Sequence, residues 1–207
     1  LLPEFIDLVE AGIVKDFGEN SFYTTAYYRN VKNLVNRVNT IYNDTILNRI
    51  YSNVGTGRSL GLEAGIELNP TSKWKVFTGA NVYQYQIKGQ FDNRPIDISA
   101  WIYSINANTS YAFTSTFSLQ WSLNYLSKRI TAQGEDSRFL SPNLVAKKTF
   151  FGDRFSATLQ WLNMDMGLLP TNEQRISTWR ENEFYTTTNY VLEVDMIMLN
   201  LSYTINP

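Results

Sequence analysis

The sequence predicts an all-β fold: an antiparallel, up-and-down transmembrane β-barrel of which about nine strands are present. Three observations support this. Apolar and polar residues alternate with a period of two along most of the chain. Short turn signals alternate along the chain with longer polar segments. Aromatic residues make up 14% of the 207 residues. Single-chain bacterial barrels have even strand numbers, so we expect an odd set of strands to be part of a larger barrel.

The alternation defines the strands one after another. In residues 101–113 the odd positions, from Trp101 to Phe113, are mostly aromatic or aliphatic, and the even positions are mostly small and polar. Such a strand separates two different environments. The same pattern recurs in residues 59–68, 116–125, 154–161 and 197–205. The nine predicted strands lie near residues 4–16, 21–36, 48–69, 73–88, 96–114, 116–130, 138–150, 153–166 and 184–206.

Compact turn signals and longer polar segments separate these strands. Outer-membrane barrels have short periplasmic turns and long extracellular loops, so this order assigns the long segments to the outer side. Near Val82 and Tyr83 the apolar positions change parity, which predicts a bulge or a strand leaving the membrane. The short turns are expected at 16–20, 69–73, 114–116 and 151–153, and the long segments at 33–48, 88–95, 130–138 and 165–183.

A soluble β-sandwich binding domain is the structural alternative, because its strands alternate too. Three features favour the membrane. Aromatic residues gather near strand ends, as in the girdles of membrane barrels. The polar faces carry Ser, Thr, Asn and Gln, and charged residues are only 18% of the chain. Several runs exceed ten residues, whereas soluble strands average about five or six.

Composition excludes several functions. The chain has no Cys and no His, which removes disulfides, thiol chemistry, the commonest metal ligand and every His-based triad. The net charge of -1 gives no footprint for nucleic acid. We therefore expect no enzyme, no cofactor, no metal site and no nucleic-acid partner.

Four short motifs follow one another along the chain: Leu2-Pro3-Glu4 with Glu10-Ala11-Gly12, Thr25-Ala26-Tyr27-Tyr28-Arg29, Asn53-Val54-Gly55 with Ser59-Leu60-Gly61-Leu62-Glu63, and Leu199-Asn200-Leu201-Ser202-Tyr203-Thr204-Ile205. Their order and spacing resemble the C-terminal barrel region of Bacteroidota-type TonB-dependent receptors, the outer membrane protein β-barrel family. The resemblance covers nearly the whole chain, although each motif alone is weakly specific.

The resemblance implies that residues 1–207 are the C-terminal portion of a 22-stranded barrel, without the plug domain and the N-terminal strands. It implies uptake of a nutrient ligand, such as a siderophore, cobalamin or a glycan, across the bacterial outer membrane. The implied partners are outer-membrane lipid, the plug and remaining strands of the same protein, TonB, and a surface lipoprotein in the case of a glycan importer. A structural or adhesive barrel without transport is the functional alternative.

Two groups of residues are candidates for the site. A polar series is expected to face the lumen, either as a wet wall or in contact with a plug, and it comprises Glu63, Glu67, Asn106, Asn108, Gln120, Asn124 and Gln160. The two glutamates share one strand face, and a luminal charge is favoured over a catalytic pair of carboxylates. An aromatic and cationic cluster in the last long segment, Trp179, Arg180, Phe184 and Tyr185, would hold a glycan or aromatic ligand, or simply rim the loops.

Overall fold

The computed structural model describes residues 1–43, 46–167 and 173–205. Within these ranges the secondary structure consists of strands, and none of the described residues lies in a helix long and apolar enough to cross a membrane. Nine strands form one antiparallel sheet in the order β1-β2-β5-β6-β7-β8-β11-β12-β15. They are β1 (Phe5–Phe17), β2 (Asn20–Lys32), β5 (Gly55–Thr71), β6 (Trp74–Phe91), β7 (Arg94–Thr114), β8 (Phe117–Leu126), β11 (Phe139–Phe150), β12 (Phe155–Leu162) and β15 (Met196–Tyr203).

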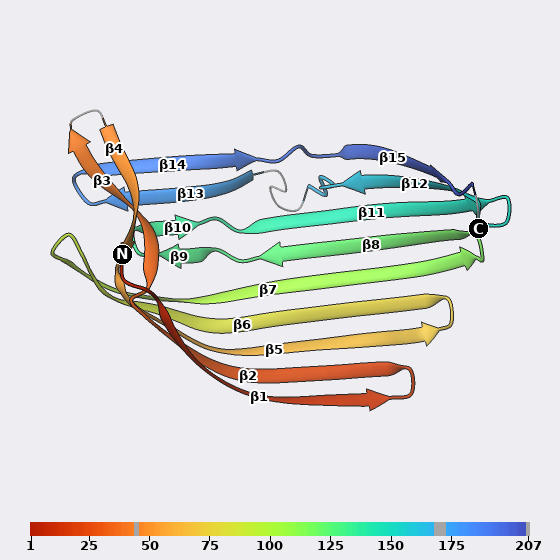
Figure 1. Ribbon diagram of the computed structural model, residues 1–207, viewed down its shortest axis with the longest axis horizontal. Coiled ribbons are helices and arrows are strands. Elements are labelled where there is room, and N and C mark those ends of the chain that lie inside the picture. The colour runs from red at the N-terminus through yellow and green to blue at the C-terminus, as the bar shows by residue number, and fades with distance from the viewer. Residues whose placement is uncertain (44–45, 168–172, 206–207) are drawn as a thin grey trace.

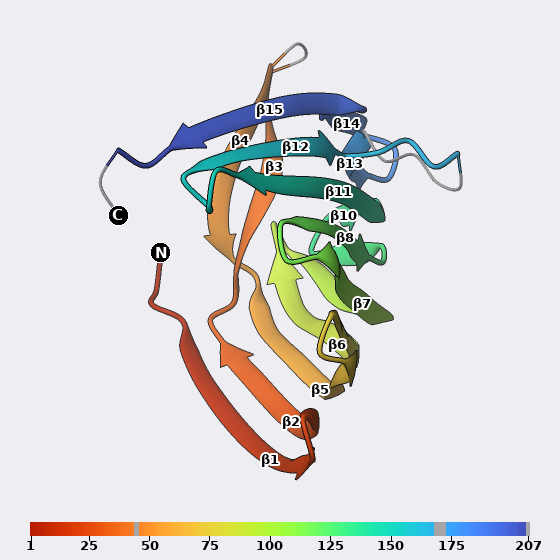
Figure 2. The same cartoon turned by 90° about the vertical axis from the view of Figure 1, so that its right-hand side faces the viewer.

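The sheet curves into an open arc, with β1 and β15 as its two edges (Figures 1 and 2). At one end the strands are joined by short turns, such as the one at Gly18, whose φ of 66° suits a residue without a side chain. The connections with additional strands lie at the other end. They form a hairpin of β3 (Val35–Asn43) and β4 (Ile46–Asn53), and a second sheet of β9 (Arg129–Thr131), β10 (Gly134–Asp136), β13 (Glu173–Arg180) and β14 (Phe184–Val191).

The predicted nine-stranded sheet is therefore present, but three of the four expected long loops contain strands. The segments 33–48, 130–138 and 165–183 contribute to β3, β4, β9, β10 and β13. Three predicted strands, 48–69, 116–130 and 184–206, each join two separate strands of the structure. These errors arose because β9 and β10 have only three residues each, while the apolar residues of the longer added strands are spaced too irregularly to show a clear period of two.

The fourth expected long loop, 88–95, is a tight hairpin. β6 runs to Phe91 and β7 begins at Arg94, with Asp92 and Asn93 at φ values of 52° and 59°. Two consecutive positive φ angles are typical of the primed turns that suit twisted hairpins, and Asp and Asn tolerate them. The polar composition of the segment thus marks a long strand pair that projects beyond the rest of the sheet.

The change of apolar parity near Val82 is not a bulge. β6 pairs with β5 and with β7 without a register shift at this position. Instead, the outward side chains change from Val82 to Gln84 and Gln86, while Tyr83 and Tyr85 occupy the opposite face. The strand therefore continues straight while its surroundings change, which agrees with the alternative that it leaves the membrane.

The strand register separates a concave from a convex face. The concave face is the one that carries Val31 and Ile87, because these residues pack against the β3–β4 hairpin on the inner side of the arc (Figure 2). The convex face carries large apolar side chains in the open, such as Leu60, which is 60% exposed, and Leu199, which is 62% exposed. A surface of this kind is stable only against lipid or another apolar partner.

Aromatic residues border this convex apolar belt. From Trp101 to Tyr111 on β7 the chain advances ten residues, which at about 3.3 Å per residue and a tilt of about 40° gives a height of roughly 25 Å. Above the belt the convex face becomes charged, with ion pairs between Lys32 and Asp7 (3.1 Å) and between Lys88 and Asp97 (3.2 Å). Its lower rim includes Trp74, Tyr111, Phe113, Phe150 and Tyr203.

The β3–β4 hairpin, which we call the strap, crosses the concave side at the end with the long connections. Its base is held by an apolar cluster of buried residues, Val31, Leu34, Val38, Val54 and Ile87. Its far side is held by polar contacts: Asn39 exchanges hydrogen bonds with the side chain of Gln133, and Arg49 donates to Thr188 on β14 (3.0 Å). The strap thus joins the first strands of the arc to the second sheet.

Candidate binding site on the concave face

The polar series from the sequence lies on one face of the sheet. The register pairs Glu63 with Asn81, Asn81 with Ser104, and Asn106 with Asn124, so these positions share a side. The structure places all seven residues on the concave face: Glu63, Glu67, Asn106, Asn108, Gln120, Asn124 and Gln160. They are spread from β5 to β12 and form a polar wall, not a single cluster.

The two glutamates on β5 have different surroundings. Glu63 accepts a hydrogen bond from the hydroxyl of Tyr23 at 3.2 Å, on the neighbouring β2. Glu67 lies opposite Ser21 and Phe77. An acid–base pair needs two carboxyl groups acting on one substrate. Here one carboxylate is already engaged by a tyrosine, which favours a polar wall over a paired-carboxylate site.

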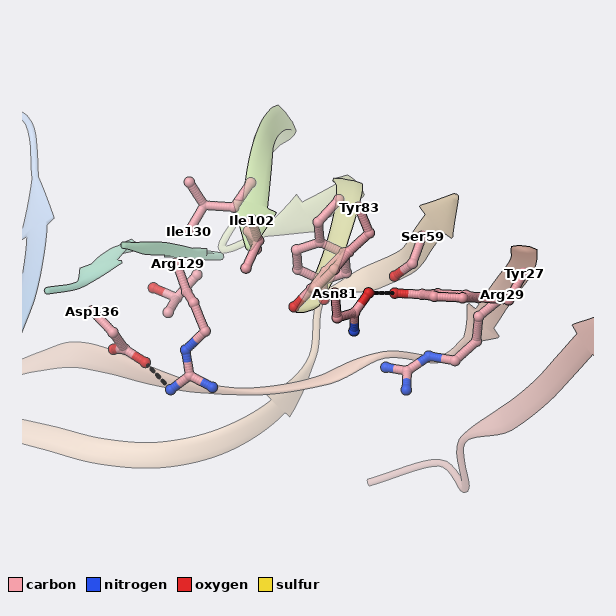
Figure 3. Close-up of a pocket in the computed structure, with 11 residues that line it drawn as sticks. Tyr27, Arg29, Ser59, Asn81, Tyr83, Ile102, Arg129, Ile130 and Asp136 are labelled. Atoms are coloured by element: carbon pink, nitrogen blue, oxygen red, sulfur yellow. Dashed lines mark hydrogen bonds and ion pairs between the residues drawn. The ribbon is translucent and has the colours of Figure 1, made fainter. Parts of the chain in front are cut away.

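The structure reveals a hollow that the sequence did not indicate. A cavity of about 370 Å³ lies on the concave face near the strap (Figure 3). Four strands of the main sheet and the β9–β10 hairpin supply its walls. The lining residues are Tyr27, Arg29, Ser59, Asn81, Tyr83, Tyr85, Ile102, Arg129, Ile130, Thr131 and Asp136.

A tyrosine laid across a glycine shapes the floor of this cavity. Tyr27 on β2 donates a hydrogen bond to the side-chain oxygen of Asn81 on β6, at 3.0 Å, and so reaches across β5 (Figure 3). This requires Gly61 on β5, because a Cβ there would lie 2.6 Å from both Cζ and the hydroxyl of Tyr27. The ring of Tyr83 lies beside that of Tyr27, with centroids 6.5 Å apart. The glycine thus makes room for an aromatic floor.

The cavity carries two guanidinium groups of different status. Arg129 on β9 forms an ion pair with Asp136 on β10 at 2.7 Å, and its buried Nε has no hydrogen-bond partner. Arg29 on β2 has no hydrogen-bond or ion-pair partner among the described residues. Both side chains flank the tyrosines in Figure 3. The charged groups that line the cavity therefore sum to one net positive charge, contributed by Arg29.

Sequence reasoning missed this cavity, although two signals were present. Tyr27 and Arg29 belong to the Tyr-Tyr-Arg motif at the upper end of β2. Tyr83 and Tyr85 are the residues that reverse the apolar parity of β6. An aromatic residue on the polar face of a membrane strand indicates a contact inside the barrel, and this interpretation would have selected both positions.

The four residues of the predicted loop cluster line one open hollow at the β13–β14 hairpin, with Trp179 and Tyr185 paired on one face and Arg180 and Phe184 on the other. Trp179 lies opposite Tyr185, and their rings stack with centroids 6.4 Å apart. Hydrogen bonding to Ser177 lowers the pKa of the Tyr185 hydroxyl below its ordinary value. Both rings are exposed, and they point away from the strap, because the neighbouring Thr186 faces it. They offer a flat aromatic surface.

Arg180 and Phe184 lie on the other face and serve the structure of the hairpin. The Arg180 guanidinium lies 5.8 Å from the ring centroids of both Phe91 and Phe184. It also forms ion pairs with Asp92 and Glu183, each at 3.0 Å. Its side chain is only 10% exposed. Arg180 therefore connects the tip of the β6–β7 hairpin to β13–β14, and these contacts enclose most of its side chain.

Within the described ranges, no group of three or more Asp and Glu residues is placed to hold a metal ion. No curated protein and no solved structure matches this chain. The model of the outer membrane protein β-barrel family matches residues 1–203. This match agrees with the antiparallel strands, the convex apolar belt and the polar concave face. The chain belongs to the outer membrane protein β-barrel family and is a protein of the bacterial outer membrane.

Proposed function

We propose that this chain forms part of the wall of a TonB-dependent transporter that takes up a nutrient solute, and that it acts in transport and not in catalysis. The observation that supports this most directly is the contrast between the two faces of the sheet. The convex face is an apolar belt about as tall as a bilayer core, whereas the concave face is polar and contains a cavity. A wall of this kind encloses an aqueous path through lipid.

The sheet edges support the proposal that the wall is incomplete by itself. Neither β1 nor β15 has a second neighbour within the described residues, and both carry exposed apolar side chains. In lipid every unpaired backbone group costs several kcal/mol, so such edges require further strands. We propose that thirteen more strands complete a barrel of 22, a size that encloses a plugged lumen (roughly as in the large outer-membrane transporters).

The remaining partners follow from that architecture. A plug domain would contact the polar concave wall, including Glu63 and Glu67, and would respond to TonB on the periplasmic side. A siderophore, cobalamin or a glycan would enter from the end that carries the strap. The exposed Trp179–Tyr185 pair offers a stacking surface to a glycan or to a surface lipoprotein at that same end.

The first test is the size of the native polypeptide. Antibodies against residues 130–138 would recover it from outer-membrane fractions, and intact mass spectrometry would give its mass. We expect a mass several times the 23.9 kDa of this chain. A mass near 24 kDa would overturn the proposal, because nine strands with two free edges would then have to close differently.

The second test concerns energised transport. The complete protein in detergent would be passed over the immobilised periplasmic domain of TonB from the same bacterium. We expect retention, and we expect its loss when the first residues of the complete protein are removed. A complete, folded protein that is never retained would support the structural or adhesive barrel in place of the transporter.

A further inference from the structure

We propose that the cavity beside the strap binds the carboxylate of a hydroxyl-rich solute, such as an acidic sugar, with Arg29 as the anion-binding side chain. This inference rests on the proposed function, since it assigns a solute class to the transport path. It is carried by the charge, the hydrogen-bonding groups and the size of the cavity.

The first argument is that Arg29 is available. Arg129, the other guanidinium of the cavity, is neutralised by Asp136. Of the carboxylates near Arg29, Glu63 accepts from Tyr23 and Glu4 accepts the backbone N–H of Val35 at 2.6 Å. Glu10 on β1 lies opposite Tyr27, and among the described residues it forms no ion pair with Arg29. Arg29 thus presents an uncommitted guanidinium at the rim of a hollow. Its planar group matches a carboxylate with two parallel hydrogen bonds.

The second argument is charge matching. The lining carries two arginines and one aspartate, which leaves a single positive charge. One carboxylate neutralises it. A phosphate monoester carries between one and two negative charges at neutral pH and would leave an excess beside Asp136. The cavity is therefore better matched to a carboxylic acid than to a phosphorylated solute.

The third argument is the rest of the lining. Ser59, Asn81 and the hydroxyls of Tyr83 and Tyr85 supply donors and acceptors to the same cavity, and the side-chain oxygen of Asn81 already accepts from Tyr27. Neutral groups of this type suit hydroxyls, while the tyrosine rings offer flat apolar faces to C–H groups. The volume of about 370 Å³ lies at the lower end of the range for small-molecule sites, roughly 300–1,000 Å³. A single sugar unit or a short acidic saccharide fits these conditions.

The test compares an acidic sugar with its neutral counterpart. Isothermal titration calorimetry on the complete protein in detergent would use D-galacturonate and D-galactose as probes. We expect D-galacturonate to bind at least tenfold more tightly. Arg29→Gln should weaken D-galacturonate binding by roughly ten- to a hundredfold, because it removes a charge-assisted pair, and should leave D-galactose unchanged. Arg29→Lys should restore part of the loss.

Arg58→Gln is the matched control. Arg58 lies on β5 opposite Asn30, one position along from the Arg29–Ser59 pair, so it points to the convex face. The Arg58→Gln substitution removes the same charge from the same region, and we expect it to leave the affinity for D-galacturonate unchanged. A thermal unfolding curve for each variant would confirm that the barrel is intact.

The inference fails if D-galacturonate and D-galactose bind equally, if neither binds, or if Arg29→Gln and Arg58→Gln behave alike. This outcome is distinct from failure of the proposed function. A complete protein that is retained by TonB but ignores D-galacturonate would refute the acidic-sugar site alone. One that binds D-galacturonate through Arg29 but lacks any TonB contact would refute transport alone.

Discussion

Replacing Gly61 by alanine tests how the floor of the cavity is built. The new Cβ would lie 2.6 Å from Cζ and from the hydroxyl of Tyr27, and 2.6 Å from Cβ of Tyr83. Tyr27 would have to move, and its hydrogen bond to Asn81 would break. Overpacking of this type costs about 1–3 kcal/mol, and the lost bond about 0.5–1.5 kcal/mol. Alanine regains about 0.5–1 kcal/mol of backbone entropy, so we expect a net loss of about 2 kcal/mol.

The measurement is urea unfolding of the complete protein in phospholipid vesicles, followed by tryptophan fluorescence. Gly79→Ala is the matched control, because Gly79 on β6 faces the concave side as Gly61 does on β5. A Cβ at Gly79 would have looser contacts, 3.2 Å to Phe77 and 3.4 Å to the Tyr23 hydroxyl. It should unfold within about 0.5 kcal/mol of the parent protein. Combining Gly61→Ala with Tyr27→Phe should cost about 1 kcal/mol less than the two separate losses, since both remove the same bond. Equal unfolding midpoints for Gly61→Ala and Gly79→Ala would refute the reasoning.

Three further predictions concern the faces of the sheet and the fastening of its long connections. Ile105→Arg should destabilise the barrel by about 2–4 kcal/mol, because Ile105 lies midway down the convex belt. The adjacent Asn106→Arg, on the concave face, should cost under about 1 kcal/mol. Unfolding of both variants in vesicles compares the two losses, and similar values would contradict the assigned faces. Gln133→Ala should speed amide hydrogen exchange in residues 35–43 by severalfold, because it removes two hydrogen bonds to the strap; unchanged exchange would show that the apolar base alone holds it. Arg180→Ala should make the β13–β14 hairpin more sensitive to cleavage by trypsin and chymotrypsin, because it removes two ion pairs and two ring contacts. Unchanged resistance of the hairpin to both proteases would mean that Arg180 is dispensable for holding it in place.

The sequence predicts the main sheet well because the signal for it is local. Each strand carries its own alternation, as between Trp101 and Phe113, and the two-residue period alone assigns every side chain to a face. The common side of Asn106, Asn124 and Gln160 follows from the same parity once the strands pair in order. Neither inference requires knowledge of distant contacts.

The strap and the cavity could not be predicted in this way. The strap is held by polar contacts between residues far apart in the chain, such as the backbone of Asn39 with the side chain of Gln133, and no local pattern encodes their meeting. The cavity combines Arg29 with Arg129, which come from two different sheets and lie far apart in the chain. The predicted loop cluster depends on hairpin pairing, because Trp179 meets Tyr185 and Arg180 meets Phe184 only once β13 and β14 are in register.

The strap also has a mechanical consequence. It crosses the concave side of the arc. One end packs near β2 and β5, and the other is hydrogen-bonded to β14. Flattening the sheet would pull the two ends of the strap apart and break its hydrogen bonds to Gln133, Thr186 and Thr188. These contacts therefore oppose any separation of β2 and β5 from the second sheet.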